Sequence, residues 1–180
     1  MPKTCPMLSA RSALPWAHHG LILGWIQERF QYTRPLLADV AVVAPSTQFA
    51  DTHVNMGIGA GDGGQVIWPF LIGVNRAKYY LMSGDKIGGK EAVEMGLASF
   101  IVAEDDQLLP RAIEIASTLA AGAPLAVAAS KLAINAYLRS ISATIFPLAA
   151  RAQEETMGSN DHQEAIAAFQ EKRAPRFTGK

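Results

Sequence analysis

Two stretches decide the fold: Ala38-Asp-Val-Ala-Val-Val-Ala-Pro-Ser-Thr-Gln-Phe49 and, soon after it, Met56-Gly-Ile-Gly-Ala-Gly-Asp-Gly-Gly64. The first is rich in β-branched and small apolar residues, which predicts a β-rich segment followed by a turn. The second is a glycine-dense loop, and a lone histidine, His53, lies between the two stretches. An amphipathic segment, Gln65 to Arg76, follows the loop. A β-rich segment that delivers polar groups to a glycine-rich loop is typical of thioester and phosphate sites.

Length and composition indicate an ordinary globular protein. The chain has 180 residues, of which 49% are hydrophobic and 18% charged, and its 16 basic and 16 acidic residues cancel. Zero net charge gives no electrostatic reason to expect a nucleic acid or an anionic membrane as partner. The single cysteine, Cys5, excludes an internal disulfide and a cysteine-built zinc site. We therefore expect a cytoplasmic protein, with an organelle matrix as the alternative compartment. No run approaches ~20 apolar residues, and we predict no membrane-spanning segment.

The spacing of apolar residues from Asn75 onward predicts a series of mostly helical elements. The first expected elements are a helix from Asn75 with a left-handed cap at Gly84, a short helix from Lys90 to Met95, and a strand from Leu97 to Val102. A helix that opens at Asp105 or Asp106 and runs to Ala121 follows, then a helix from Pro124 and a segment from Ser140 to Met157 that is broken or bent near Pro147. The last expected helix has Asp161 as N-cap, Glu164 in capping-box position and Phe169 facing inward. Met1 to Arg34 keeps neither helical nor strand periodicity, so a regular domain is expected to begin near Pro35.

The glycine loop also has the G-x-G-x-x-G spacing of dinucleotide-binding sites, at Gly59-Ala-Gly61-Asp-Gly-Gly64. That fingerprint requires a strand running directly into the loop and a second parallel strand that ends at an acidic residue. Asp85 has the right separation but follows a predicted helix and its glycine cap. A nicotinamide or flavin site is therefore a weak alternative, tested by NAD binding. The sequence contains no G-x-S-x-G, Walker or H-E-x-x-H motif.

His53 and Asp62 are the candidate catalytic residues. Asp51 and Asp62 flank His53, and a carboxylate close to an imidazole tunes acid–base chemistry. In the alternative interpretation His53 is a hydrogen-bonded structural residue, and Asp62 only caps the helix that opens near Gly64. His53 has no partner histidine or cysteine at metal-ligand spacing, so no metal site is predicted. The sequence leaves open whether these side chains come together.

From Leu37 to the C-terminus the chain resembles the enoyl-CoA hydratase/isomerase (crotonase) family. The resemblance rests on six motifs that occur in the family's order. They are Ala38-Asp-Val with Gln48-Phe49, the loop from Gly57 to Gly64, the segment from Ile72 to Asp85, Glu91-Ala-Val-Glu-Met-Gly-Leu-Ala98, Pro124 with Lys131, and Ala168-Phe-Gln-Glu-Lys-Arg-Ala-Pro-Arg-Phe177.

The resemblance implies an α/β fold, an incomplete crotonase-like β-β-α spiral over residues 35–122 followed by a helical region over residues 123–180 that forms trimers, often paired into hexamers. It implies an acyl-CoA thioester as ligand, with coenzyme A as part of the substrate and no separate cofactor. Two backbone N–H groups would stabilise the enolate that develops at the thioester carbonyl. His53 takes the position of a catalytic glutamate of the family.

Other candidate site residues follow from the same motifs. Gly57, Gly59 and Gly61 are expected to shape the substrate pocket. Phe169 and Lys172 are candidate substrate-binding residues, because the basic C-terminal segment can meet a phosphate; the alternative is that it is a solvated surface. A branch of the family carries Asp-Thr-His-Val followed by Gly-Asp-Gly-Gly, so we expect His53 and Asp62 to be native to a subfamily.

The N-terminal part departs from the family. In ungapped register the glycine of one oxyanion donor falls on Phe30 and the other catalytic glutamate falls on Thr33, while the early segment with the second donor has no counterpart. We hypothesise that Met1 to Arg34 arises from a frameshift, a misassigned start or a rearranged gene. Translation of the upstream DNA in the other two frames tests this, and the absence of an H-G-x-x-x-G-x-G segment there would contradict it.

The sequence therefore predicts an acyl-CoA-binding protein, by resemblance an enoyl-CoA hydratase or isomerase that adds water to an enoyl-CoA or shifts its double bond. The alternative is a truncated, non-catalytic paralogue that acts only as an oligomerising or CoA-binding module. Hydration of crotonyl-CoA separates the two.

Overall fold

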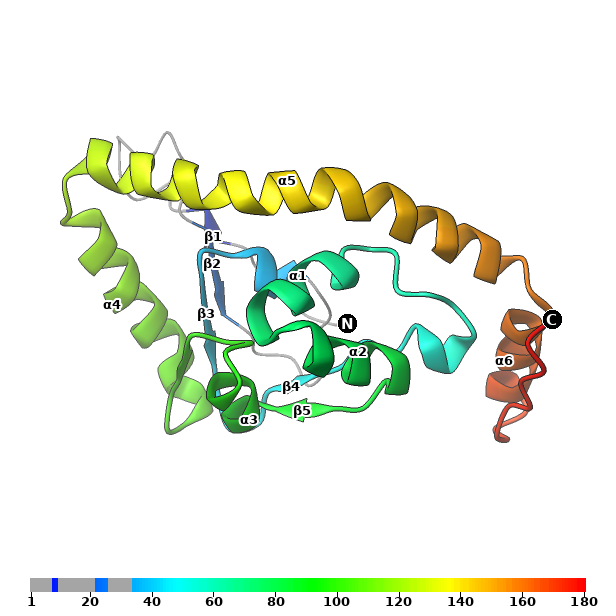
Figure 1. Cartoon of the computed structure of the whole chain (residues 1–180). Coiled ribbons are helices and arrows are strands. Elements are labelled where there is room, and N and C mark those ends of the chain that lie inside the picture. The colour runs from blue at the N-terminus through cyan, green and yellow to red at the C-terminus, as the bar shows by residue number, and fades with distance from the viewer. Residues whose placement is uncertain (1–7, 10–21, 26–33) are drawn as a thin grey trace. The chain divides into compact units, whose positions relative to one another are not determined.

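The computed structural model describes residues 8–9, 22–25 and 34–180 (Figure 1). The chain divides into two compact units. The first contains Met1–Phe49 and Ile87–Leu138, and the second contains Ala50–Lys86 and Arg139–Lys180. The predicted division after residues 34 and 122 follows the resemblance to the family and not compactness, and it stays a prediction.

The first unit is organised around two small sheets. Their strands are β1 (Leu8–Ser9), β2 (Ile22–Trp25), β3 (Val40–Val43), β4 (Gln48–Phe49), β5 (Ile87–Gly88) and β6 (Phe100–Ile101). One sheet has the order β1-β2-β3-β6, antiparallel between β1 and β2 and parallel elsewhere, and the other pairs β4 with β5 antiparallel. Parallel neighbours require crossover connections. The combination of partly parallel strands and helices confirms the predicted α/β class.

The core of the first unit lies on β3. Val42 and Ala44 are fully buried and pack with Val102 and Leu108. A near-continuous apolar run of this kind is typical of a strand covered on both faces. The predicted strand from Leu97 to Val102 forms only at β6, because the backbone N–H groups of Leu97 and Ala98 both donate to the carbonyl of Ala92 and hold a turn there.

The helices of the first unit surround this core. They are η2 (Arg34–Leu37), α3 (Gly89–Glu94), η4 (Asp105–Gln107) and α4 (Leu108–Ala120), and the N-terminal part of α5 (Pro124–Met157) also belongs to this unit. Two of the sequence motifs meet in this unit, since the Lys131 ammonium donates to Asp39 Oδ2 at 2.6 Å and both side chains are largely shielded from solvent. The ion pair joins the two motifs within the first unit.

The second unit is helical. Its elements are η3 (Val54–Met56), α1 (Gly64–Ile72), α2 (Val74–Ser83) and α6 (Asn160–Gln170), together with the C-terminal part of α5 (Pro124–Met157). α1 and α2 pack against each other, and Trp68 of α1, which is fully buried, lies 6.3 Å from Tyr80 of α2 between ring centroids. α2 ends at Gly84 in the left-handed conformation with φ of 72°, which confirms the predicted cap.

α5 is one continuous helix of 34 residues (Figure 1). We predicted a separate segment from Ser140 with a break or bend near Pro147. The break does not occur. An interior proline removes one backbone donor and crowds the carbonyl four residues earlier, but here the helix continues through it.

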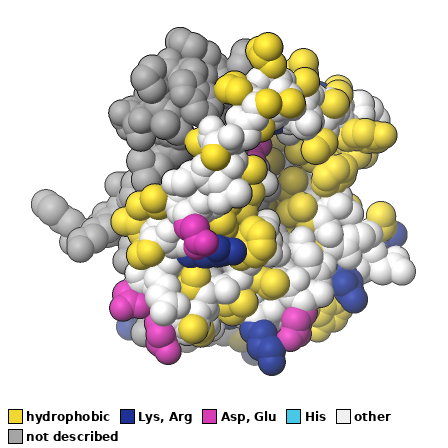
Figure 2. All heavy atoms as spheres, turned by 90° about the vertical axis from the view of Figure 1, so that its left-hand side faces the viewer, with side chains coloured by type: hydrophobic (Ala, Val, Ile, Leu, Met, Phe, Trp, Pro, Cys, Tyr) yellow, Lys and Arg dark blue, Asp and Glu magenta, His cyan; other side chains and the backbone are white. Residues whose placement is uncertain are grey.

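Much of α5 carries apolar side chains on its surface. Leu125 is 87% exposed, Tyr137 68% and Leu148 67%, and Figure 2 shows hydrophobic side chains gathered on one face of the molecule. In the described part of the chain, α5 is long and apolar enough to cross a membrane by length and composition alone, a weak criterion that core helices of soluble proteins also meet. The prediction of no membrane-spanning segment is thus not confirmed.

Residues 171–180 fold back onto α6, and we call them the C-terminal clasp. Asp161 accepts from the backbone N–H of Thr178 at 2.7 Å and of Gly179 at 2.8 Å, and Glu164 accepts from that of Arg176 at 2.8 Å. The carbonyl of Lys180 accepts from the N–H of Asn160 at the start of α6. The clasp thus satisfies the backbone donors of its own chain end with two acidic side chains.

The structure corrects the predicted last helix in two respects. The N-cap of α6 is Ser159, whose hydroxyl accepts from the His162 N–H at 3.1 Å, and not Asp161. Asp161 is in the first turn, where it holds the clasp. Phe169 does not face inward, because it is 77% exposed, while Ala165 and Ala168 form the buried face of α6.

We expect the clasp to loosen in strong acid. The guanidinium of Arg173 and the N–H of Arg176 lower the pKa of Glu164 to about 2. A carboxylate whose pKa is depressed by folding contributes stability above its unfolded pKa, and this contribution is lost as the pH falls through the folded value. NMR titration should place the Glu164 midpoint near 2 and move the Arg176 amide signal with it. A Glu164 midpoint above 4 would contradict the clasp.

Candidate functional site

The candidate site is the loop from Ala50 to Gly64 in the second unit. η3 gives the first part of the loop a fixed shape, because the carbonyl of His53 accepts from the N–H groups of Met56 and Ile58. α6 supports this turn, since His162 Nδ1 lies 2.8 Å from the carbonyl oxygen of Met56. The loop is therefore tied both internally and to a helix more than 100 residues later in the sequence.

His53 is paired with Asp51. His53 Nδ1 lies 2.7 Å from Asp51 Oδ1, and the same oxygen accepts from the backbone N–H of His53 at 3.3 Å. The Asp51 side chain is 2% exposed and that of His53 20% exposed. A buried carboxylate that accepts from Nδ1 fixes the tautomer and orientation of the imidazole and leaves Nε2 for chemistry. Such a pair is chemically able to transfer a proton, and it is equally able to act as a structural hydrogen bond.

Asp62 completes the cluster. Ligand atoms of Asp51, His53 and Asp62 lie within 4.8 Å of one another, and Asp62 is exposed. The interpretation of Asp62 as a helix cap is wrong, because α1 begins after Gly63 and no side chain caps it. The structure therefore brings together the three polar residues that the sequence left apart. Asp51 was the one not chosen as a site residue, although its position two residues before His53 was a usable signal.

The cluster has the composition of a small cation site, with two carboxylates and one imidazole. Asp51 Oδ1 is already engaged by His53, and Asp51 Oδ2 is buried without a hydrogen-bond partner among the described residues. These contacts use Asp51 to hold the imidazole and leave His53 and Asp62 as the outward-facing polar groups. The prediction of no metal site stays a prediction.

We expect His53 to titrate above the usual range of histidine. The hydrogen bond to Asp51 raises its pKa above 6.5, burial opposes the shift, and the negative charges of Asp51 and Asp62 add to it. The contribution of the protonated His53–Asp51 pair to the stability of the fold is therefore fully present below pH 6.5, and it is lost as the pH rises through the folded pKa of His53. NMR titration of the ring should show a midpoint above 6.5 that falls in Asp51→Asn and stays unchanged in Asp106→Asn. A midpoint at or below 6.5 in the unmodified protein would contradict the pairing.

The three predicted pocket glycines have different roles. Gly57 has φ of 66°, and a Cβ there would lie 2.9 Å from backbone atoms of Asp161 and His162. A Cβ on Gly61 would lie 2.5 Å from the Cβ of Gln153 and 2.9 Å from the carbonyl oxygen of Ala149. Gly57 and Gly61 thus allow the loop to pack tightly against α6 and α5. Gly59, by contrast, lines a cavity, and its N–H donates to Thr156 Oγ1 at 2.9 Å.

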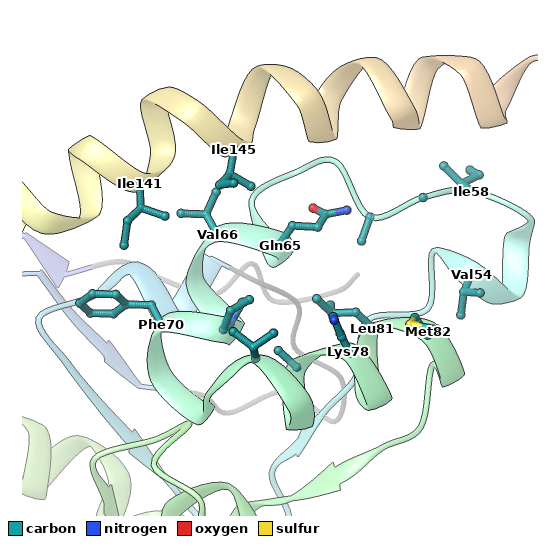
Figure 3. A pocket seen from close by; sticks show the side chains of 15 residues that line it. Val54, Ile58, Gln65, Val66, Phe70, Lys78, Leu81, Met82, Ile141 and Ile145 are labelled. Carbon is teal, nitrogen blue, oxygen red and sulfur yellow. The ribbon is translucent and has the colours of Figure 1, made fainter.

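The second unit contains an apolar cavity of about 980 Å³ (Figure 3). The loop contributes Val54, Ile58, Gly59 and Ala60, α1 and α2 form two further walls, and Ile141 and Ile145 of α5 close it from the other side. Among the described residues of the lining, Lys78 is the one that is ionisable. The sequence contains one signal for this cavity, the shared helix face of Val74, Ala77, Lys78 and Leu81. On sequence alone, such a face is equally typical of a helix that is buried in the core.

The remaining candidate residues lie elsewhere. Phe169 is exposed at the end of α6, and Lys172 lies just after it with φ of 55°. Neither lines the cavity. Phe30 and Thr33 lie outside the described residues.

The G-x-G-x-x-G loop does not have the surroundings of a dinucleotide site. A 3₁₀-helix, η3, precedes it in place of a strand, and Asp85 follows α2 and its glycine cap. The local structure therefore gives the nicotinamide or flavin alternative no support.

Comparison with known proteins shows which family this chain resembles. The family model described as enoyl-CoA hydratase/isomerase matches residues 35–180. The chain is 31% identical over 145 residues to a crotonyl-CoA hydratase of Syntrophomonas wolfei, covering 81% of this chain and 55% of that protein. It is 32% identical over 135 residues to a short-chain-enoyl-CoA hydratase of Clostridium acetobutylicum, covering 75% and 51%.

Solved structures agree. A carnitinyl-CoA dehydratase from Mycobacterium avium 104 superposes with a TM-score of 0.74 and 26% identity, covering 81% of this chain and 57% of that one. This likeness confirms the predicted crotonase-like fold. The chain spans about half the length of the curated relatives it matches.

Proposed function

Because the chain belongs to the enoyl-CoA hydratase/isomerase family, we propose that it binds an acyl-CoA thioester and adds water to, or moves a proton within, its enoyl group. The observation that carries this proposal is the His53–Asp51 pair with Asp62 beside it, in the family's glycine loop. The non-catalytic alternative is not favoured, because a partly exposed imidazole held by a buried carboxylate is suited to proton transfer.

In the proposed hydration, Asp51 holds His53 Nδ1 and His53 Nε2 removes a proton from water as the water oxygen bonds the β-carbon. The electrons of the carbon–carbon double bond move to the thioester, which becomes an enolate. The imidazolium of His53 then returns a proton to the α-carbon, while the Asp62 carboxylate accepts a hydrogen bond from the water and orients it, so that one water is added and His53 returns to its starting state. In a double-bond shift the same two groups would move a proton between carbons.

Further parts of the proposal concern the rest of the ligand and the assembly. Phe169 and Lys172 are exposed and are proposed to contact the coenzyme A portion, with no cofactor besides it. The exposed apolar surface of α5 supports a homo-oligomer, because large uncovered apolar patches mark interaction sites. We also propose a cytoplasmic location, supported by the single cysteine and its poor fit to an oxidising compartment.

A hydratase assay tests the proposal. We expect the protein to consume crotonyl-CoA, measured as the loss of the conjugated thioester absorbance, and Asp62→Asn to reduce the rate strongly. Asp106→Asn, a chemically matched change at an exposed residue of η4, should leave the rate unchanged. Lack of turnover of both crotonyl-CoA and octenoyl-CoA in a protein that elutes as a defined oligomer would contradict the catalytic proposal.

A further inference from the structure

The cavity beside the candidate site has the character of a binding site for a hydrocarbon chain. Its volume of about 980 Å³ lies at the upper end of ordinary small-molecule sites. Gln65 and Lys78 are the two lining residues with long polar side chains, and the rest are apolar or glycine. Such a lining gives an apolar ligand many contacts and offers few partners to a polar one.

His53 and Asp62 do not themselves line the cavity, but residues beside them in the chain do. Val54 directly follows His53, while Ala60 and Gln65 lie on either side of Asp62 in the sequence. The cavity then extends along α1 and α2, where Ile141 and Ile145 of α5 point toward Phe70 and Val66 (Figure 3). A ligand whose reactive end is at His53 and Asp62 can therefore place its apolar end in this cavity.

The length of the cavity can be compared with that of an acyl chain. Its lining on α2 runs from Val74 to Met82, and eight residues of helix rise by about 12 Å. An extended hydrocarbon chain advances by roughly 1.3 Å per carbon, given carbon–carbon bonds of about 1.5 Å. About nine carbons would span the wall, whereas the four carbons of a crotonyl group would leave most of it uncovered.

We infer that this cavity holds the aliphatic chain of the bound thioester and selects medium-chain acyl-CoA substrates, on the order of eight to ten carbons, over four-carbon ones. The inference rests on the proposed function. Ile145 is the residue assigned to set the usable length, because it closes the cavity from α5 opposite Val66 (Figure 3).

The test is the affinity of the full chain for free coenzyme A and for butanoyl-, octanoyl- and hexadecanoyl-CoA, measured by isothermal titration calorimetry. Saturated ligands separate binding from turnover. Each buried methylene is expected to tighten binding about fourfold, the equivalent of about 0.8 kcal/mol. We expect octanoyl-CoA to bind at least tenfold more tightly than butanoyl-CoA, with little further gain for hexadecanoyl-CoA. Equal affinities for butanoyl- and octanoyl-CoA would overturn the inference.

A variant pair locates the effect. Ile145→Trp should weaken octanoyl-CoA binding at least tenfold and leave butanoyl-CoA within twofold, while Ala143→Trp, at an exposed residue of the same helix outside the cavity lining, should change neither. If Ile145→Trp does not fold, as judged by circular dichroism, Ile145→Ala replaces it and should also weaken octanoyl-CoA selectively. An equal response of both ligands, or of both positions, would overturn the assignment.

The outcomes also separate this inference from the function on which it rests. If free coenzyme A and butanoyl-CoA bind but chain length has no effect, the chain-length inference is wrong and acyl-CoA binding stands. If none of the four ligands binds, the proposed function is wrong and the inference is wrong with it.

Discussion

Replacing His53 with glutamine is expected to lower kcat/KM for an enoyl-CoA by about 10²- to 10⁴-fold, the usual contribution of a positioned general acid or base. Glutamine keeps the size and polarity of the side chain but cannot carry a proton between water and carbon. The reason to expect a loss of this size is the 2.7 Å contact with Asp51, which orients the ring. The measurement is steady-state hydration of crotonyl- and octenoyl-CoA.

Asp51→Asn extends this test, because Asp51 acts through His53 and not on the substrate. An amide cannot compensate the imidazolium charge, so the rising limb of the pH–rate profile should move to lower pH together with the His53 pKa. A merely structural role of Asp51 would change the amount of folded protein without shifting the profile. Full activity of His53→Gln, or loss of activity in Asp106→Asn of equal size, would contradict the assignment.

The second large effect is expected from Gly61→Ala. The new Cβ would lie 2.5 Å from the Cβ of Gln153 and 2.9 Å from the backbone oxygen of Ala149, so α5 and the loop would have to move apart. Forced overpacking of this kind costs about 1–3 kcal/mol. We expect the free energy of unfolding in urea to fall by that amount and, since the loop carries Asp62, turnover to fall as well.

Gly59→Ala is the matched control for this substitution. Its Cβ would have no neighbour closer than 3.7 Å, which is ordinary van der Waals contact. An alanine there should leave the free energy of unfolding within about 0.5 kcal/mol of the parent, as for most substitutions that create no clash. If Gly59→Ala and Gly61→Ala were equally destabilising, the close approach of α5 would not be the reason for glycine at position 61.

Much of the architecture could be predicted from sequence, because it depends on local signals. Gly84 ends α2 in the left-handed conformation, as a glycine after the last apolar position of a helix predicts. β3 forms where Val40 to Val43 give a continuous run of β-branched and small residues. The break expected near Pro147 did not occur: an interior proline loses one hydrogen bond and crowds the carbonyl four residues earlier, at a cost of about 3 kcal/mol or more, and this 34-residue helix continues in spite of that cost.

The site was only partly predictable, because it depends on contacts that are not local in the sequence. His53 and Asp62 were chosen from their neighbours and from the family motif, but their proximity depends on the path of the loop between them. The cap of α6 was assigned to Asp161 from its spacing to Glu164, although Ser159 takes that role. Both acidic residues instead bind the clasp, a contact across more than ten residues of sequence that no local pattern encodes.

The sequence by itself determined the family, the α/β class and the loop on which the chemistry lies, because motif order and apolar periodicity are properties of the chain alone. Tertiary structure decided that Asp51 holds His53, that Gly57 and Gly61 are required by α6 and α5, and that Val66, Leu81 and Ile145 enclose one cavity. These features arise from side chains that meet only after the loop, α1, α2 and the end of α5 have packed. Such contacts depend on distances in space, and the spacing of residues along the chain does not determine those distances.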